Sequence, residues 1–122
     1  MAKTVLVVEE NEHLRHIVAR VLRFYGYETV EAASGAEAIK KAASAQPNLI
    51  LLDLNLPDFT GIDVARLIKA NRRSSHIPII ACSAFSKGEE RDESLGAGMV
   101  DYLQKPIPSQ LLKTSIEKFI LP

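Results

Sequence analysis

The sequence predicts an α/β protein in which a parallel sheet is covered by helices on both faces. Five apolar runs of strand length recur along the chain, and helix-like segments lie between them. Strands that alternate with helices in this way are typical of parallel sheets with right-handed crossovers. Three of the runs are nearly continuous in Val, Leu and Ile, the pattern of strands that are buried on both sides.

The predicted strands differ in how their apolar residues are arranged. The first, third and fourth are almost wholly apolar, so we expect helices over both of their faces. The second alternates apolar and polar residues, which is typical of a strand at the edge of a sheet. We predict strands at residues 5–8, 27–32, 49–54, 77–83 and 99–103.

The predicted helices begin at capping residues. Residues 12–25 carry apolar side chains at helical spacing, with Asn11 placed to cap the first turn and Gly26 to end the helix. Three more helices begin with a hydroxyl residue and an acid three positions later, the spacing of a capping box. These pairs are Ser34 with Glu37, Thr60 with Asp63, and Ser86 with Glu89.

The last two helical segments differ in how much apolar surface they offer. The segment at about 109–120 places Leu112, Ile116 and Phe119 on a buried side, whereas the segment 87–98, KGEERDESLGAG, has one large apolar residue, Leu95. Because little burial would hold segment 87–98 in place, we expect it to be a mobile element or a partner surface.

Length and composition indicate a single domain over residues 1–122 and exclude several classes of function. The chain is 47% hydrophobic and 25% charged, with 15 basic and 15 acidic residues, so no net charge would draw it onto nucleic acid or an anionic membrane. No apolar run approaches the roughly 18 residues that span a bilayer. The single cysteine, Cys82, cannot form an intrachain disulfide, so we expect a cytoplasmic protein without direct nucleic-acid or membrane partners.

Polar residues follow four of the five predicted strands. In a doubly wound sheet the carboxyl ends of the strands meet at one edge, where ligands bind. Three acids, one hydroxyl and one lysine would therefore share this edge. They are Glu9 and Glu10 after the first strand, Asp53 at the end of the third, Ser83 at the end of the fourth, and Lys105, followed by Pro106, after the fifth.

These residues predict a magnesium-dependent phosphoryl-transfer site. Carboxylates held close together repel one another unless a cation intervenes, and Mg²⁺ prefers carboxylate and carbonyl oxygens, here from Glu9, Glu10, Asp53 and the main-chain carbonyl of Asn55. Lys105 would stabilise charge on a phosphoryl group and Ser83 would donate to it. Asp53 would be the nucleophile, and the product would be an acyl phosphate.

The whole chain resembles the receiver domain of two-component response regulators. Four motifs carry the resemblance: VLVVEEN, LILLDLNLPDFTG, PIIACSA and DYLQKPI. Glu10, Asp53, Ser83 and Lys105 follow one another at intervals of 43, 30 and 22 residues, as is typical of receivers. The resemblance implies a flavodoxin-like sheet with strand order 2-1-3-4-5 and five helices on both faces.

The resemblance also implies roles and partners. Asp53 would take a phosphoryl group from a sensor histidine kinase or a histidine phosphotransfer protein, as a signalling module and not an enzyme. Ser83 would then move toward the phosphoryl group and Tyr102 would turn inward, while a cis bond before Pro106 would aim Lys105 at the site. Segments 87–98, 99–103 and 109–120 would form the switched surface, for a downstream target, an output domain or a homodimer.

One residue departs from the receiver pattern. The second acid after the first strand is usually aspartate and binds the metal, whereas here it is Glu10. A degenerate receiver that binds a partner without phosphorylation is therefore the alternative. A metal-dependent phosphatase or a topoisomerase-primase-type domain is disfavoured, because those sites have a second aspartate two residues after the first, whereas Asp53 is followed by Leu54 and Asn55. A nucleotide-binding domain is disfavoured because the first strand is followed by EENEH in place of a glycine-rich loop.

Overall fold

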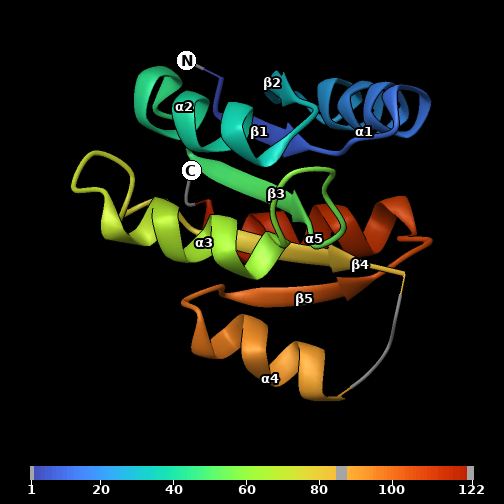
Figure 1. The fold of residues 1–122 in the computed structure, drawn as a ribbon. Helices are drawn as coiled ribbons and strands as arrows, with labels where there is room; N and C mark the ends of the chain where they lie inside the picture. Colours follow the sequence, from blue (N-terminus) through green and yellow to red (C-terminus); the bar gives the residue numbers. More distant parts are fainter. Residues whose placement is uncertain (1, 85–87, 121–122) are drawn as a thin grey trace.

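The computed structural model describes residues 2–84 and 88–120 and contains five strands that alternate with five helices (Figure 1). The strands are β1 (Thr4–Val8), β2 (Glu28–Ala32), β3 (Leu49–Asp53), β4 (Ile79–Ser83) and β5 (Asp101–Gln104). The helices are α1 (Glu12–Phe24), α2 (Gly35–Ala45), α3 (Gly61–Ala70), α4 (Gly88–Gly96) and α5 (Ser109–Phe119).

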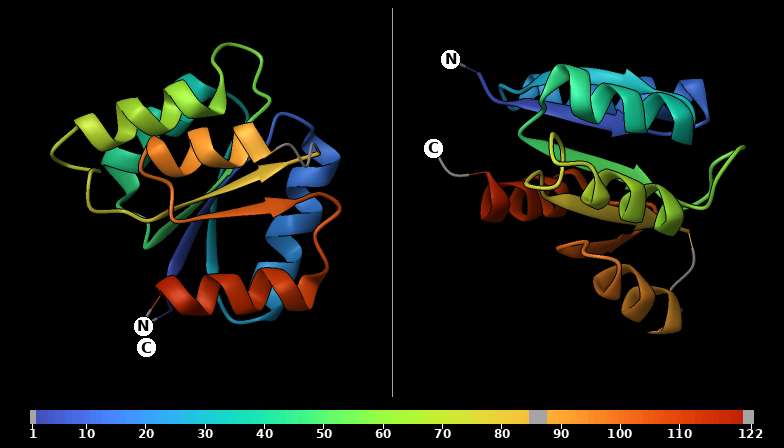
Figure 2. Two further views of the ribbon diagram at one scale, coloured as in Figure 1. Left: turned by 90° about the horizontal axis from the view of Figure 1, so that it is seen from below. Right: turned by 60° about the vertical axis from the view of Figure 1, so that its left-hand side comes forward.

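All strand pairs are parallel, and the sheet order is β2-β1-β3-β4-β5. Helices α1 and α5 lie on one face of the sheet, and α2, α3 and α4 lie on the other (Figure 2). The predicted fold class, the strand order and the edge position of the second strand are confirmed. The carboxyl ends of the strands therefore meet at one edge, as a site at this edge requires.

The sheet separates two apolar cores. Successive residues of a strand point to opposite faces, so Leu6, Ile50 and Ile79 pack under α2 and α3, whereas Val5, Leu49 and Ile80 pack under α1 and α5. Strands β3 and β4 are buried at every position, as their continuous apolar sequences predict. This division also assigns the residues just beyond the strands to one face or the other.

The predicted caps are confirmed where the structure describes them. The side-chain oxygens of Asn11, Ser34 and Thr60 accept hydrogen bonds from main-chain amides at the starts of α1, α2 and α3. Ser86, predicted to cap α4, lies outside the described residues. Each cap satisfies an amide that has no partner within its own helix.

Strands β4 and β5 begin two residues later than predicted. The Ile77 amide donates to the Ser74 carbonyl, at 3.0 Å, and so closes a turn before β4 begins. Met99 likewise belongs to a turn before β5. Its amide donates to the Ser94 carbonyl at 3.1 Å, and Gly98, just before it, has a φ of 93°. Hydrophobic pattern alone does not reveal such turn hydrogen bonds, so it predicts strands that include the apolar residues Ile77 and Met99.

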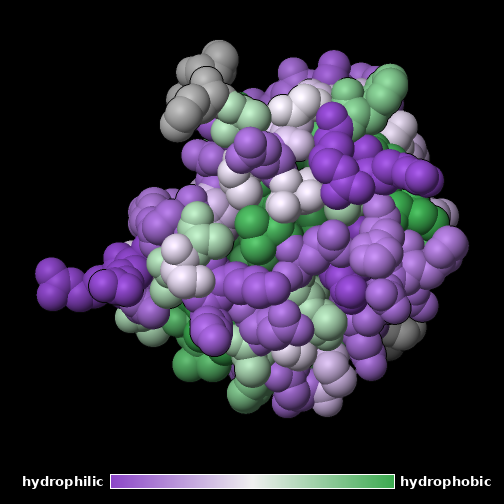
Figure 3. Space-filling model, turned by 90° about the horizontal axis from the view of Figure 1, so that it is seen from above, coloured by the Kyte–Doolittle hydropathy of each residue, from purple (hydrophilic) through white to green (hydrophobic). Residues whose placement is uncertain are grey.

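Helix α1 leaves part of its apolar face uncovered. Ala19 and Leu22 are buried, whereas Leu14 and Ile17 keep 45% and 44% of their surface exposed. The view of the molecule from above is mainly hydrophilic, with separate apolar patches (Figure 3). Within residues 2–84 and 88–120, no helix is long and apolar enough to cross a membrane.

Candidate phosphoryl-transfer site

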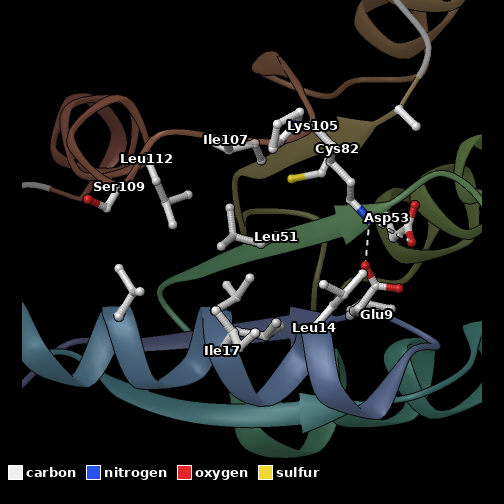
Figure 4. A pocket seen from close by; sticks show the side chains of 16 residues that line it. Glu9, Leu14, Ile17, Leu51, Asp53, Cys82, Lys105, Ile107, Ser109 and Leu112 are labelled. Carbon is white, nitrogen blue, oxygen red and sulfur yellow. Dashed lines mark hydrogen bonds and ion pairs between the residues drawn. The ribbon is translucent and has the colours of Figure 1, made fainter.

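Three strands bring Glu9, Asp53 and Lys105 together. Glu9 directly follows β1, Asp53 ends β3, and Lys105 follows β5. The Lys105 ammonium donates to Glu9 Oε1 at 2.5 Å and to Asp53 Oδ2 at 3.1 Å (Figure 4). The side chains of Glu9 and Asp53 are 9% and 8% exposed, so two buried carboxylates share one cation.

Main-chain amides orient both carboxylates. The Asn55 amide donates to Asp53 Oδ1 at 3.0 Å, and the Asn11 amide donates to Glu9 Oε2 at 3.2 Å. Each carboxylate therefore has one oxygen on an amide and the other on the ammonium of Lys105. The Lys105–Pro106 peptide bond is cis, the isomer that the resemblance implies.

The shared cation leaves the two acids in different electrostatic states. Burial, together with the neighbouring Glu9 carboxylate, raises the pKa of Asp53 above its ordinary value. Burial is the largest single effect on Glu9 and acts to raise its pKa, but the hydrogen bonds from Lys105, Asp53 and the Asn11 amide together outweigh burial, so the pKa of Glu9 is lowered. The pKa of Lys105 is raised, because its bonds to the two acids outweigh its burial. Asp53 therefore carries the less stable negative charge of the pair.

The structure does not gather all the predicted metal ligands into one cluster. Glu10 is exposed to solvent, and among residues 2–84 and 88–120 no three His, Cys, Asp or Glu side chains converge closely enough to hold a metal. Two carboxylates converge, those of Glu9 and Asp53. Mg²⁺ is commonly held by one or two carboxylates together with water and phosphate oxygens, so this all-oxygen, net negative pair fits the ion.

Ser83 and Tyr102 form a second group on the α4 side of the sheet. Ser83 is fully buried at the end of β4, and Tyr102 packs against the core under α2 and α3. The Tyr102 hydroxyl donates to Glu90 Oε1 of α4 at 2.6 Å. Burial and Glu90 raise the pKa of Tyr102, and a hydrogen bond with Ser83 opposes them. A chain of contacts thus leads from the strand ends to α4.

Sequence reasoning missed Arg15, which fixes the backbone of the acidic pair. Its Nη1 donates to the Glu9 carbonyl at 2.9 Å and to the Glu10 carbonyl at 3.4 Å, while its Nε pairs with Glu31 Oε1 at 3.1 Å. Arg15 lies one helical turn after the cap Asn11, so a search for basic residues on the first turn of α1 could have found it. It ties β1, α1 and β2 together beside the site.

An apolar cavity of about 420 Å³ adjoins the acidic site. It lies between α1 and α5, and Figure 4 shows Leu14 and Ile17 of α1 facing Leu112 of α5 across it. The side chains of Asp53 and Lys105 line it as well. The exposed apolar residues of α1 therefore lead directly to the candidate nucleophile.

Comparisons with known proteins agree with this geometry. Residues 5–117 match the response regulator receiver domain family. The polar-differentiation response regulator DivK of Brucella ovis is 32% identical over 120 residues, which cover 98% of each chain. The chemotaxis protein CheY4 of Vibrio cholerae superimposes with a TM-score of 0.93 at 27% identity, covering 98% of this chain and all of the other.

A second solved structure bears on the metal. The receiver domain of the sensor histidine kinase PA1611 from Pseudomonas aeruginosa PAO1 is 31% identical, with a TM-score of 0.90 over 98% of both chains, and is described with a magnesium ion coordinated in its active-site cleft. This chain belongs to the response regulator receiver domain family. It is a signalling module of two-component systems and not a classical enzyme.

Proposed function

We propose that Asp53 accepts a phosphoryl group from a phosphohistidine of a sensor histidine kinase or a histidine phosphotransfer protein, with Mg²⁺, in the cytoplasm. The observation that carries the proposal is the buried Asp53 carboxylate, with one oxygen on the Asn55 amide and the other 3.1 Å from the Lys105 ammonium. If Asp53 served only to pair with Lys105 for structural reasons, a second buried acid, Glu9, bonded to the same ammonium would not be required.

In the proposed reaction an Asp53 carboxylate oxygen bonds to phosphorus as the phosphorus–nitrogen bond of the donor breaks. The electron pair of that bond stays on the imidazole, which takes up a proton. Lys105, already placed between Asp53 and Glu9, would stabilise the charge on the phosphoryl oxygens. Mg²⁺, held by Glu9, Asp53 and the Asn55 carbonyl, with Glu10 as a further ligand, would supply additional charge neutralisation when bound.

Intact mass spectrometry tests this function. Incubation with Mg²⁺ and a small acyl-phosphate donor should add one phosphoryl group, and Asp53→Asn should abolish the addition. The matched control is Asp63→Asn, because Asp63 is an exposed acid of α3 whose carboxylate pairs with Arg66 of the same helix at 3.7 Å. Absence of any gain across a range of metal and donor concentrations would contradict the proposal.

A degenerate receiver is the second candidate, and the exposed position of Glu10 favours it. Such a domain would bind its partner without phosphorylation. Glu10→Asp separates the two candidates. In a working receiver with an imperfect ligand it should tighten Mg²⁺ binding and speed phosphorylation, whereas unchanged metal binding and no phosphorylation in either protein would support the degenerate receiver.

The cavity between α1 and α5 suits the docking of the phosphoryl donor. A donor histidine must reach Asp53. Leu14 and Ile17 are exposed apolar residues, and they line the same cavity as Asp53. Ile17→Ser should therefore slow transfer from the donor protein while leaving phosphorylation by a small acyl phosphate unchanged. Equal slowing of both reactions would exclude docking as the cause.

We further propose that phosphorylation of Asp53 switches the surface formed by α4, β5 and α5. In this proposal Ser83 moves to bind the phosphoryl group, and Tyr102 follows it inward, away from Glu90. The surface would bind a downstream protein target, an output domain or a second copy of the chain. Its exposed apolar residues are Leu95, Val100 and Leu111. A change in gel-filtration elution volume on phosphorylation, abolished by Leu95→Ser, would support the homodimer.

A further inference from the structure

The Asp58 carboxylate, in the loop between β3 and α3, binds the amino end of α2. Its Oδ1 accepts from the Gly35 amide at 2.8 Å, and its Oδ2 accepts from the Ala36 amide at 2.9 Å. These amides belong to the first two residues of α2 and have no carbonyl partner within the helix. A residue 22 to 23 positions further along the chain thus satisfies the start of α2.

The same loop carries the amide that orients the candidate nucleophile. Asn55, three residues before Asp58, donates its amide to Asp53 Oδ1 at 3.0 Å. The loop is also held by an isolated bridge between Asn55 and Thr60 and by the Gly61 amide, which donates to the Leu54 carbonyl at 3.0 Å. Leu54 is buried and Leu56 packs partly against the core, whereas residues 57–60 are exposed to solvent, so little apolar burial fixes that part of the loop.

Close packing shows that the loop is seated on α2. A Cβ atom added to Gly35 would lie 2.8 Å from Phe59 Cδ2, 2.8 Å from Val64 Cγ2 and 3.1 Å from Asp58 Oδ1. Any side chain at position 35 would therefore push the loop away from the helix. At this point α2, the loop and the start of α3 are therefore in close contact.

We propose that Asp58 is a positioning residue for Asp53. By fixing the loop to α2, Asp58 holds the Asn55 amide on Asp53 Oδ1, which leaves Asp53 Oδ2 facing Lys105. Loss of Asp58 would release the loop and let the carboxylate of Asp53 rotate. The proposal rests on the phosphorylation of Asp53 proposed above, but the position of the Asn55 amide can be measured without it.

The test compares two losses at the same end of α2. Asp58→Ala removes the capping acid that belongs to the loop, whereas Ser34→Ala removes the helix's own cap, the Ser34 hydroxyl that accepts from the Glu37 amide at 3.2 Å. Asp58→Asn keeps one acceptor oxygen and serves as the conservative variant. The two measurements are the rate of phosphorylation by a small acyl phosphate at limiting Mg²⁺, followed by intact mass, and hydrogen exchange of the Asn55 amide.

We expect Asp58→Ala to slow phosphorylation by about tenfold, within the roughly hundredfold loss that a misplacement of about 1 Å can cause. The Asn55 amide should exchange faster in this variant, Asp58→Asn should lie between it and wild type, and Ser34→Ala should change neither measurement. Equal effects of Ser34→Ala and Asp58→Ala would overturn the proposal, since capping of α2 would then explain both. If wild type takes up no phosphoryl group, the proposed function fails, and Asn55 exchange alone decides the role of Asp58.

Discussion

Asp53→Asn should stabilise the folded protein at neutral pH in the absence of divalent ions. The substitution keeps the side-chain shape and an acceptor for the Asn55 amide, but removes a buried negative charge. At an effective dielectric constant of about 20, the attraction between Asp53 and Lys105 at 3.1 Å is about 5 kcal/mol. This attraction is lost, so the gain must come from two other sources.

The first source is repulsion between the acids. The two carboxylate oxygens that contact Lys105, at 2.5 and 3.1 Å, lie at most about 5.6 Å apart, where two unit charges repel by about 3 kcal/mol. The second is burial of the Asp53 charge, which costs several kcal/mol. The two together slightly exceed the lost attraction, in agreement with the raised pKa of Asp53. We expect a net gain of about 1 kcal/mol, or about 3–6 °C in Tm.

Thermal unfolding with a chelator, at pH 7 and again at acidic pH, measures this gain. Because the folded-state pKa of Asp53 is raised, its charge lowers stability fully above that pKa, and this loss fades as the pH falls from the folded-state pKa to the unfolded-state pKa. The advantage of Asp53→Asn should therefore disappear as the pH falls from the folded-state to the unfolded-state pKa of Asp53. Asp58→Asn is the matched control of opposite sign, since amide hydrogen bonds lower the pKa of Asp58. Destabilisation by Asp53→Asn at pH 7, or an equal gain at acidic pH, would refute the reasoning.

Three further substitutions test the contacts around the site. Lys105→Met should destabilise the protein by about 2–4 kcal/mol at pH 7, because it leaves Glu9 and Asp53 without their cation. Millimolar Mg²⁺ should restore part of that loss in urea unfolding, and no effect of Mg²⁺ would argue against binding at this pair. Tyr102→Phe removes the 2.6 Å bond to Glu90, so it should cost about 1 kcal/mol and speed amide exchange in α4; exchange that rises equally in α2 would point to a global effect. Gly61→Ala should cost about 3 kcal/mol, since its Cβ would lie 2.5 Å from Leu54 Cα, whereas Gly96→Ala has open space and should cost nothing.

Hydrophobic pattern predicted the strands, the helices and their layers because it is a local property of each element, whereas the strand order followed from the resemblance to receiver domains. The continuous runs around Leu51 and Ile80 could be buried only between two layers of helices, and the alternation around Thr29 placed that strand at an edge. The acids and the lysine could be placed because parallel strands end at one edge. None of these inferences needed a contact between particular side chains.

Contacts between distant loops could not be predicted in the same way. Asp58 reads in the sequence as a turn residue after Pro57, and nothing local indicates that its carboxylate binds the amides of Gly35 and Ala36. The bond from Tyr102 to Glu90 likewise joins two elements across 12 residues. Such bonds depend on the relative placement of elements, which packing decides.

Alternation along the strands explains how the site is divided. Val5 and Val7, Leu49 and Leu51, and Leu103 all face α1 and α5, and continuing each strand by two residues places Glu9, Asp53 and Lys105 on that same face. Ser83 follows Cys82, which faces α1 and α5, and therefore points to the opposite side with Tyr102. The candidate nucleophile and the contacts to α4 thus lie on opposite faces of the sheet. If Asp53 is phosphorylated as proposed, the signal must pass around the end of β4, where a phosphoryl group extending beyond β3 would come within reach of the Ser83 hydroxyl.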